Sequence, residues 1–263
     1  MTGKIIKNEK ILPGAELYDL RFELPEAAAA AKPGQFVHIN CGPQFTLRRP
    51  ISVCEADGKT LRVCYDVRGK GTARLAQFKP GDPIDILPPT GRGFDLRGSG
   101  RALLVGGGIG IYPLLWCAKL YGRRCDAALG FRSADIVNLN GEFAEHCASV
   151  SVITDDRGYV TELVAAALEN AAAGGEQYSV IHTCGPKPMM RGVAALAERY
   201  SVECEVSMEE RMACGVGACM GCVCKIKDAD ANPEHRCDCN IDAVNRRVCV
   251  DGPVFNAKDV IWE

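Results

Sequence analysis

The chain has 263 residues, enough for about two domains, and its 47% hydrophobic and 24% charged residues give the balance of an ordinary globular protein with a buried core. The net charge of −2 and the lack of a basic block exclude nucleic acid as a partner, because phosphate binding needs clustered lysine and arginine. No apolar signal segment opens the sequence, and the longest apolar run, residues 102–116, is too short and glycine-rich for a membrane helix, so we expect a cytoplasmic protein without membrane contact.

The first hundred residues predict antiparallel β-structure. Short apolar segments alternate there with Pro-Gly and Gly-Asp turns. About five or six strands of this kind are typical of a small barrel or sandwich, and we expect a β-barrel over residues 1–97. The segments are KIIKNEKI, YDLRFELP, GQFVHINC, PISVCEA, TLRVCYDV and DPIDILPP.

From Arg101 onward, strand and helix patterns alternate. This alternation indicates a parallel sheet with crossover helices, an α/β domain over residues 98–205. After Val206 the regular pattern stops, and the cysteine-rich residues 206–263 predict a small third domain built around a metal. The strand segments are ALLVGGGIG, CDAALGF, VSVITDD and YSVIHTCGP, and the helical segments are IYPLLWCAKLYG, TELVAAALENAAA and PMMRGVAALAERY.

Two turns of the α/β domain have features of nucleotide-binding loops. A glycine-rich turn follows the first strand, where backbone N–H groups and a helix N-terminus can meet a pyrophosphate, although tight packing also requires glycine. Residues 183–190 end a later strand, and Cys184 is expected to face the same crevice, because open parallel sheets bind ligands at the carboxyl ends of their strands. The glycines of the first turn are Gly106, Gly107, Gly108 and Gly110.

Two segments of the predicted barrel carry groups that suit an anion. Residues 49–52 place the cation of Arg49 and the hydroxyl of Ser52 on one strand, and residues 68–72 precede the short helix TARLAQF. A solvated surface arginine is the alternative interpretation of each segment.

Fifteen cysteines indicate metal or redox chemistry in a chain of this size without a signal segment. Cys214, Cys219 and Cys222 have the C-x4-C-x2-C spacing of a plant-type 2Fe-2S cluster, which takes a fourth cysteine further along the chain. Soft thiolates suit iron, and the intervening glycines let the loop wrap closely and leave backbone N–H groups free to point at the sulfurs.

The fourth ligand has three candidates, Cys237, Cys239 and Cys249, and spacing alone does not choose among them. A zinc site that joins Cys219 and Cys222 to Cys237 and Cys239 is the rival metal interpretation, although the single residue between the last two is poor spacing for zinc. A cysteine cluster without any metal is the third interpretation.

Six motifs occur in a fixed order that resembles a known family. They are RPIS, RGKGT, VGGGIG, CGPKPMM, ERMACGVGACMGCVC and CVDGPVF. Their order resembles the electron transfer subunit of dihydroorotate dehydrogenase B, within the ferredoxin reductase superfamily, over essentially the whole chain. MACGVGACMGC followed by CVDGPVF is the most specific part, whereas RPIS and the glycine turn are shared across the superfamily.

The resemblance implies FAD in residues 1–97, NAD in residues 98–205 and a 2Fe-2S cluster in residues 206–263. The residues implied for FAD are Arg49, Pro50, Ile51, Ser52, Cys64, Tyr65, Asp66, Gly71 and Thr72. The residues implied for NAD are Gly106, Gly107, Gly108, Gly110, Cys184, Gly185 and Pro186. Cys184 shapes the nicotinamide pocket in this interpretation, and no residue acts as a general base or nucleophile.

The family's fourth cluster cysteine stands directly before DGPVF, and that residue here is Cys249. The implied cluster ligands are therefore Cys214, Cys219, Cys222 and Cys249, with Cys237 as the rival for the fourth place. Many family members carry arginine where this chain has Asp66, and Arg68 is the candidate substitute.

The function implied is an electron relay in pyrimidine biosynthesis. Electrons pass from NADH through FAD and the cluster to the FMN of a catalytic dihydroorotate dehydrogenase subunit, and in the physiological direction orotate forms and NAD+ is reduced. The expected assembly is a heterotetramer with two catalytic subunits. The alternatives are a paralogous NAD(P)H-dependent subunit of a ferredoxin:NADP oxidoreductase or sulfide dehydrogenase, and a zinc-binding interaction module without enzymatic activity.

Overall fold

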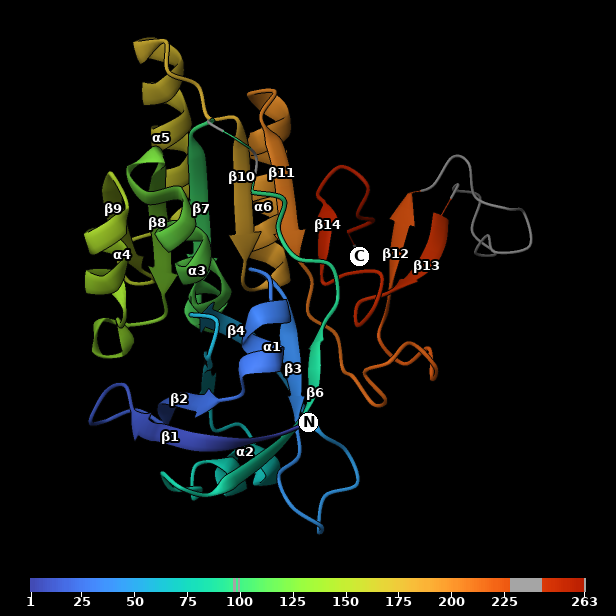
Figure 1. Ribbon diagram of the computed structural model, residues 1–263. Coiled ribbons are helices and arrows are strands. Elements are labelled where there is room, and N and C mark those ends of the chain that lie inside the picture. Colours follow the sequence, from blue (N-terminus) through green and yellow to red (C-terminus); the bar gives the residue numbers. More distant parts are fainter. Residues whose placement is uncertain (97, 99, 228–242, 263) are drawn as a thin grey trace.

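A computed structural model describes residues 1–96, 98, 100–227 and 243–262 of the chain. It consists of a β-barrel, an α/β unit stacked on one end of the barrel, and a C-terminal segment with a small hairpin beside both (Figure 1). The multi-domain β plus α/β architecture expected from the sequence is confirmed.

The N-terminal strands close into a barrel with the order β1-β2-β5-β4-β3-β6. Alternation of side chains fills its interior: Leu20 and Phe22 of β2 are fully buried and pair with Val63 and Leu61 of β5. The short helix α1 (Pro25–Ala30) follows β2, and α2 (Lys70–Leu75) follows β5. The strands are β1 (Thr2–Lys10), β2 (Leu17–Glu23), β3 (Phe36–Ile39), β4 (Arg49–Ala56), β5 (Thr60–Asp66) and β6 (Pro83–Thr90).

The α/β unit contains a six-stranded sheet with the order β14-β11-β10-β7-β8-β9. Five of its strands are parallel, as the alternating pattern predicts, whereas the edge strand β14 runs antiparallel to β11. The strands are β7 (Ala102–Gly107), β8 (Cys125–Phe131), β9 (Ser149–Thr154), β10 (Val180–Cys184), β11 (Glu203–Ser207) and β14 (Val254–Asn256).

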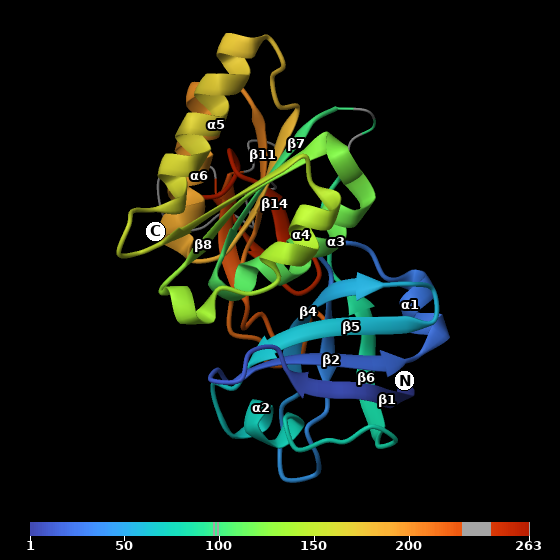
Figure 2. The ribbon, with the colours of Figure 1, turned by 90° about the vertical axis from the view of Figure 1, so that its left-hand side faces the viewer.

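Helices cover both faces of this sheet (Figure 2). Helices α3 and α4 lie on one face, and α5 and α6 pack together on the other. The helices are α3 (Ile111–Tyr121), α4 (Asn140–His146), α5 (Val160–Gly174) and α6 (Lys187–Arg199), with single 3-10 turns at η1 (Gly108–Gly110), η2 (Gly122–Arg124) and η3 (Ala134–Ile136).

The two units share apolar cores and so form a continuous body. Helix α3 packs directly on β4 of the barrel, and Trp116 of α3 belongs to the apolar cluster of the barrel interior. Phe36 of the barrel strand β3 belongs to the same apolar cluster as Cys222 and Val248 of the C-terminal segment. These contacts fix the barrel, the sheet and the C-terminal segment relative to one another.

The C-terminal segment leaves the sheet and returns to it. Ser207, the last residue of β11, pairs in register with Val254, the first residue of β14. Between them the chain forms the cysteine-rich loop and the antiparallel strands β12 (Val223–Lys227) and β13 (Ala243–Arg247). Across the residues that the structure describes, no helix is both long enough and apolar enough to cross a membrane.

Candidate cofactor cavity and cysteine site

A cavity of about 530 Å³ lies where the barrel meets the carboxyl edge of the sheet. Volumes of a few hundred Å³ are typical of small-molecule sites. Most of the residues predicted to bind FAD and NAD line this one cavity, although they come from distant parts of the sequence. Those that line it are Arg49, Pro50, Ile51, Ser52, Cys64, Tyr65, Asp66, Thr72, Gly107, Gly108, Gly110, Cys184, Gly185 and Pro186.

Two predicted residues, Gly71 and Gly106, lie directly behind the cavity wall. A Cβ at Gly71 would lie 2.2 Å from Nε of Arg49, and a Cβ at Gly106 would lie 2.8 Å from Cγ2 of Ile111. Gly106 therefore needs to be glycine for close packing against the backbone of Ile111, whereas a side chain at Gly71 would require the Arg49 side chain to move. Neither residue contributes to the lining itself.

The barrel wall of the cavity is built by β4, β5 and the turn that starts α2. The hydroxyl of Thr72 accepts the N–H groups of Arg68 and Gly69 at 3.0 and 3.2 Å and donates to the carbonyl oxygen of Gly69 at 3.1 Å, which fixes this turn. Arg68 lines the cavity, and its Nε lies 2.5 Å from Oδ2 of Asp66. A guanidinium thus stands in the wall two residues after Asp66.

The opposite wall is built by the turns that follow β7 and β10. A Cβ at Gly110 would lie 2.2 Å from the carbonyl oxygen of Cys184, so the two turns touch through their backbones. Gly108 has a φ of +55° and open space around it, the conformation and the exposure that let backbone N–H groups approach a phosphate. Burial raises the pKa of Cys184 to about 12, so its side chain is a neutral thiol in this wall.

A third wall was not predicted from the sequence. It comes from the segment after β11, from Phe36, and from the start of α3, where Tyr112 lies with its hydroxyl buried in the lining. The position of this segment at the carboxyl end of β11 was the available signal, because parallel strands place their ligands there. The additional lining residues are Phe36, Arg68, Ile109, Tyr112, Pro113, Ser207, Met208, Glu209, Glu210, Met212 and Pro253.

The cysteine loop continues from this third wall. Met212 lines the cavity, and Cys214 follows two residues later. Hydrogen bonds from backbone N–H groups, chiefly those of Val216 and Cys219, lower the pKa of Cys214 to about 6. The N–H of Cys219 donates to Sγ of Cys214 at 3.4 Å. The loop therefore presents backbone donors to a sulfur, as a thiolate site requires.

The four predicted ligands lie as two neighbouring pairs. Cys214 contacts Cys219, and the thiol of Cys249 contacts that of Cys222. Burial and the neighbouring Cys222 raise the pKa of Cys249 to about 11. Over the described ranges, no three His, Cys, Asp or Glu side chains are already arranged to hold a metal ion. Cys237 and Cys239 lie outside the described residues.

Arg247 joins the two halves of the cysteine site. Its Nη1 donates to the carbonyl oxygen of Gly217 in the loop at 3.1 Å. Its backbone N–H and Nε donate to Oδ2 of Asp251 at 2.8 and 3.0 Å, and this turn contains Cys249. The N–H of Val248 also donates to the carbonyl oxygen of Cys222 at 2.8 Å. These bonds hold Cys249 beside the loop although 27 positions separate it from Cys222.

The residues present fit the three cofactors. A 2Fe-2S cluster takes four thiolates, and two thiol pairs lie together here with backbone donors around them. The cavity combines an open glycine turn at a helix start with a cation-bearing strand, the two features that dinucleotide phosphates need.

Comparison with known proteins gives the same assignment for the C-terminal segment. The family model of the iron-sulfur cluster binding domain of dihydroorotate dehydrogenase B matches residues 209–261, which include Cys214, Cys219, Cys222 and Cys249. A solved structure of an NADH-dependent reduced ferredoxin-NADP oxidoreductase superposes with a TM-score of 0.81 and 27% identity, covering 99% of this chain and 90% of the other. A ferredoxin reductase of carbazole 1,9a-dioxygenase shares the fold, with a TM-score of 0.61, 18% identity and coverage of 77% and 66%.

Curated relatives match over nearly the whole chain. The electron transfer subunit of dihydroorotate dehydrogenase B (NAD(+)) from Caldanaerobacter subterraneus subsp. tengcongensis is 35% identical over 100% of this chain and 98% of its own. The subunits of the same name from Bacillus caldolyticus and Clostridium perfringens are 40% and 36% identical over 88% and 98% of this chain, and over 87% and 96% of their own length. This protein therefore belongs to the family of the electron transfer subunit of dihydroorotate dehydrogenase B.

Proposed function

We propose that this protein carries electrons between NAD(H) and the FMN of a catalytic dihydroorotate dehydrogenase subunit, through FAD and a 2Fe-2S cluster. One observation carries the proposal. A single cavity joins the barrel strand β4, the glycine turn after β7 and the cysteine segment after β11. That segment lines the cavity with Glu209, Glu210 and Met212. The first cysteine of the loop, Cys214, follows Met212 by two residues.

FAD exchanges a hydride with a nicotinamide ring and single electrons with a 2Fe-2S cluster, and this is the chemistry that the bound cofactors supply. The protein binds and orients them. Arg49 and Ser52 of β4 face the flavin in this proposal, and the turn over residues 69–72 binds its pyrophosphate. Cys64, Tyr65 and Asp66 of β5 form the wall beside it, and Arg68 supplies the nearby cation.

The turns after β7 and β10 bind the nicotinamide dinucleotide. Gly107, Gly108 and Gly110 let the pyrophosphate approach the start of α3, whereas Cys184 to Pro186 shape the nicotinamide end of the cavity. The neutral Cys184 thiol offers an apolar surface there, in agreement with its pKa of about 12. In this proposal no residue of the chain acts as a nucleophile or as a general acid or base.

Cys214, Cys219, Cys222 and Cys249 are the proposed cluster ligands. We assign one cofactor to each proposed domain: FAD to residues 1–97, NAD to residues 98–205 and the cluster to residues 206–263. We also propose a cytoplasmic location, since all cysteines that the structure describes are free thiols, the state that a reducing compartment maintains.

The proposed partner is the FMN-containing catalytic subunit, in a heterotetramer with two copies of each chain. The cysteine loop offers a docking surface for it. Val216 and Met220 are 59% and 50% exposed, and Cys219 between them is exposed as well. Exposed apolar side chains beside a redox centre suit a partner that takes electrons there.

The similarity to the reduced ferredoxin-NADP oxidoreductase supports a second candidate, a subunit of such an enzyme. Its 27% identity is lower than the 35–40% identity to the dihydroorotate dehydrogenase subunits. Co-purification distinguishes the two candidates, because only the first predicts a complex that oxidises dihydroorotate.

The first experiment is anaerobic purification with a visible spectrum and assays for flavin, iron, sulfide and zinc. We expect flavin bands, about one FAD and about two irons per chain, and bleaching of both by NADH. A colourless protein that contains zinc would contradict the relay. A flavoprotein without iron would restrict the function to residues 1–205.

A further inference from the structure

His38 lies where the barrel meets the cysteine loop. It occupies β3, every residue of which is buried, and only 1% of its surface is exposed. Its neighbours across the sheet are Pro50 of β4 and Leu87 of β6. Its ring also packs on that of Phe36, with 5.4 Å between the ring centroids, and Phe36 lines the cofactor cavity.

The other side of the His38 ring touches the cysteine loop at Gly215. A Cβ at Gly215 would lie 2.3 Å from Nε2 and 2.4 Å from Cε1 of the imidazole, distances that no real side chain tolerates. Gly215 also has a φ of +69°, which L side chains rarely adopt. The residue after Cys214 is therefore seated directly on the His38 ring.

The Nε2 atom of His38 is buried and has no hydrogen-bond partner within the described part of the chain. Buried polar atoms are nearly always paired, so an atom left unpaired among the described residues is available to a bound group. The cysteine loop borders this ring at Gly215, and Cys214, a proposed cluster ligand, directly precedes Gly215 in the chain. Backbone donors already converge there, since the N–H of Cys219 lies 3.4 Å from Sγ of Cys214.

We propose that His38 is a positioning residue for the cluster, which seats the cysteine loop on the barrel through Gly215 and donates its Nε2–H to the sulfur atoms of the cluster site. This inference rests on the proposed function, because it assumes that a 2Fe-2S cluster occupies the four cysteines. The inference gives His38, a barrel residue far from the cysteines in sequence, a role in tuning the cluster.

The consequence is a higher reduction potential of the cluster. A hydrogen bond to sulfur stabilises the reduced state more than the oxidised state, because the reduced cluster carries one more negative charge. Removal of the donor therefore shifts the electron toward the flavin. We expect the equilibrium constant for one-electron transfer between flavin and cluster to change by roughly tenfold. This corresponds to a shift of about 59 mV in the cluster potential.

The test compares His38→Leu and His38→Gln with the wild type, because Gln keeps a side-chain N–H donor and Leu removes it. His146→Leu, a histidine of α4 in the other unit, is the matched control. Flavin, iron and sulfide are measured per chain, and the cluster potential is measured by redox titration monitored by EPR. We expect a lower potential in His38→Leu, recovery in His38→Gln and no change in His146→Leu.

A second measurement uses the folded wild-type protein. Pulsed EPR of the reduced cluster, with 15N-labelled histidine, should detect a weakly coupled histidine nitrogen that disappears in His38→Gln. Absence of this coupling, or equal potentials in His38→Leu and the wild type at full iron content, would overturn the inference. A wild type without iron would instead overturn the proposed function, so the two failures are distinguishable.

Discussion

Backbone contact at single glycines fixes the distance between the two nucleotide turns. Gly110 meets the carbonyl oxygen of Cys184 so closely that a Cβ would lie 2.2 Å away, and a backbone carbonyl has little room to give. The sequence pattern indicated a phosphate-binding turn at these glycines. It did not indicate this contact, because the partner lies more than seventy positions away in the sequence.

Single substitutions test whether Cys249 or Cys237 is the fourth cluster ligand. Cys249 lies beside Cys222 and is held there through Arg247, so in the proposed ligand set Cys249→Ser removes one of four thiolates. We expect Cys249→Ser to lose most of its iron and the visible bands of the cluster while it keeps flavin, measured by iron analysis of anaerobically purified protein.

Cys237→Ser is the matched control and should keep about two irons per chain. The opposite pattern, with iron lost only in Cys237→Ser, would make Cys237 the fourth ligand. Equal iron content in both variants and the wild type would remove both cysteines from the ligand set.

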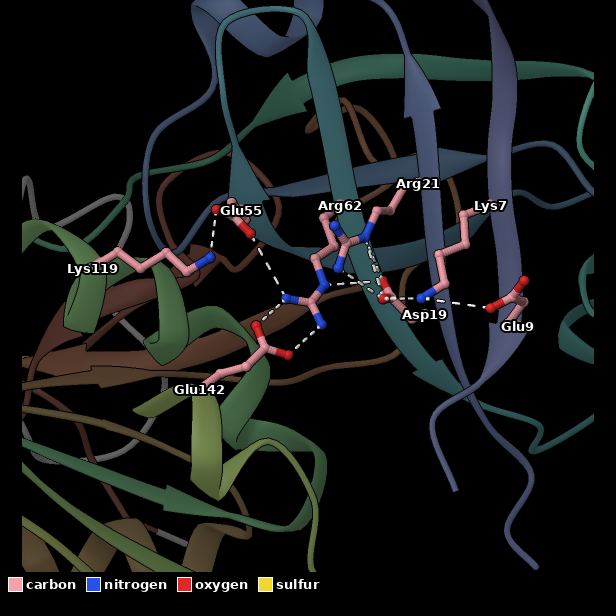
Figure 3. Close-up of polar contacts among 8 residues, drawn as sticks. All are labelled: Lys7, Glu9, Asp19, Arg21, Glu55, Arg62, Lys119 and Glu142. Carbon is pink, nitrogen blue, oxygen red and sulfur yellow. Dashed lines mark hydrogen bonds and ion pairs between the residues drawn. The ribbon is translucent and has the colours of Figure 1, made fainter. Parts of the chain in front are cut away.

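Among the elements, β5 and α4 are joined by an ion network that links the barrel to the α/β unit (Figure 3). Arg62 of β5 is 3% exposed, and its two terminal nitrogens donate to Glu142 of α4 at 2.6 and 2.9 Å. Its Nε donates to the buried Asp19 at 2.9 Å. Lys119 of α3 pairs with Glu55 of β4 at 2.6 Å, which adds a second link.

We expect Arg62→Leu to lower the free energy of unfolding by about 3 to 5 kcal/mol, because it removes the buried guanidinium that pairs with both Asp19 and Glu142. Arg21→Leu removes an exposed partner of the same carboxylate and should cost under about 1 kcal/mol. Denaturant unfolding of the two variants checks this difference. Equal losses would show that the inter-unit link contributes little.

The same network makes stability depend on acid. Burial alone would raise the pKa of Asp19, but Arg21 and Arg62 outweigh it, and the pKa is lowered from 3.8. The hydrogen bond from Arg62 likewise lowers the pKa of Glu142 from 4.5. Groups with lowered pKa values stabilise the fold fully above their unfolded values and lose this contribution as the pH falls through the folded ones.

We therefore expect the unfolding free energy of the wild type to fall below about pH 4.5. The fall should be smaller in Glu142→Gln, which has one fewer carboxyl group to protonate. Denaturant unfolding at several pH values between 3 and 7 measures both curves. Parallel curves for the two proteins would show that Glu142 makes no such contribution.

The sequence pattern predicted most of the strands and helices and missed some of the short ones. Short apolar segments between turns marked all six barrel strands, and the strand-helix alternation marked β7 to β10 with α3, α5 and α6. Helix α4 was missed, because it has seven residues, starts after a left-handed Leu139 and has no capping side chain. Strand β14 was missed as well, because three residues carry no period and its partner lies about fifty positions earlier.

At the scale of the whole molecule, the proposed relay passes electrons to the partner where the cysteine loop reaches the surface. We expect Val216→Glu to weaken association with the catalytic subunit by tenfold or more, since a charge buried at an interface costs above about 1.4 kcal/mol. Leu120→Glu is the matched control, because Leu120 of α3 is 51% exposed and lies in another unit.

Affinity is measured by titration of the purified subunits, with iron and flavin contents as a check on folding. Equal weakening in both variants would show a general effect of added charge. Unchanged affinity in Val216→Glu would place the partner on another surface.

The pairing of Ser207 with Val254 shows how the cysteine-rich segment is connected to the sheet. Because β11 and β14 are antiparallel, a two-residue turn could join them and leave the sheet complete. The cysteine-rich segment thus leaves the sheet and re-enters it at one hairpin position, and its removal would also take Met208, Glu209 and Met212 out of the cavity wall. Truncation after Ser207 is a different change, since it exposes the unpaired edge of β11 and invites aggregation.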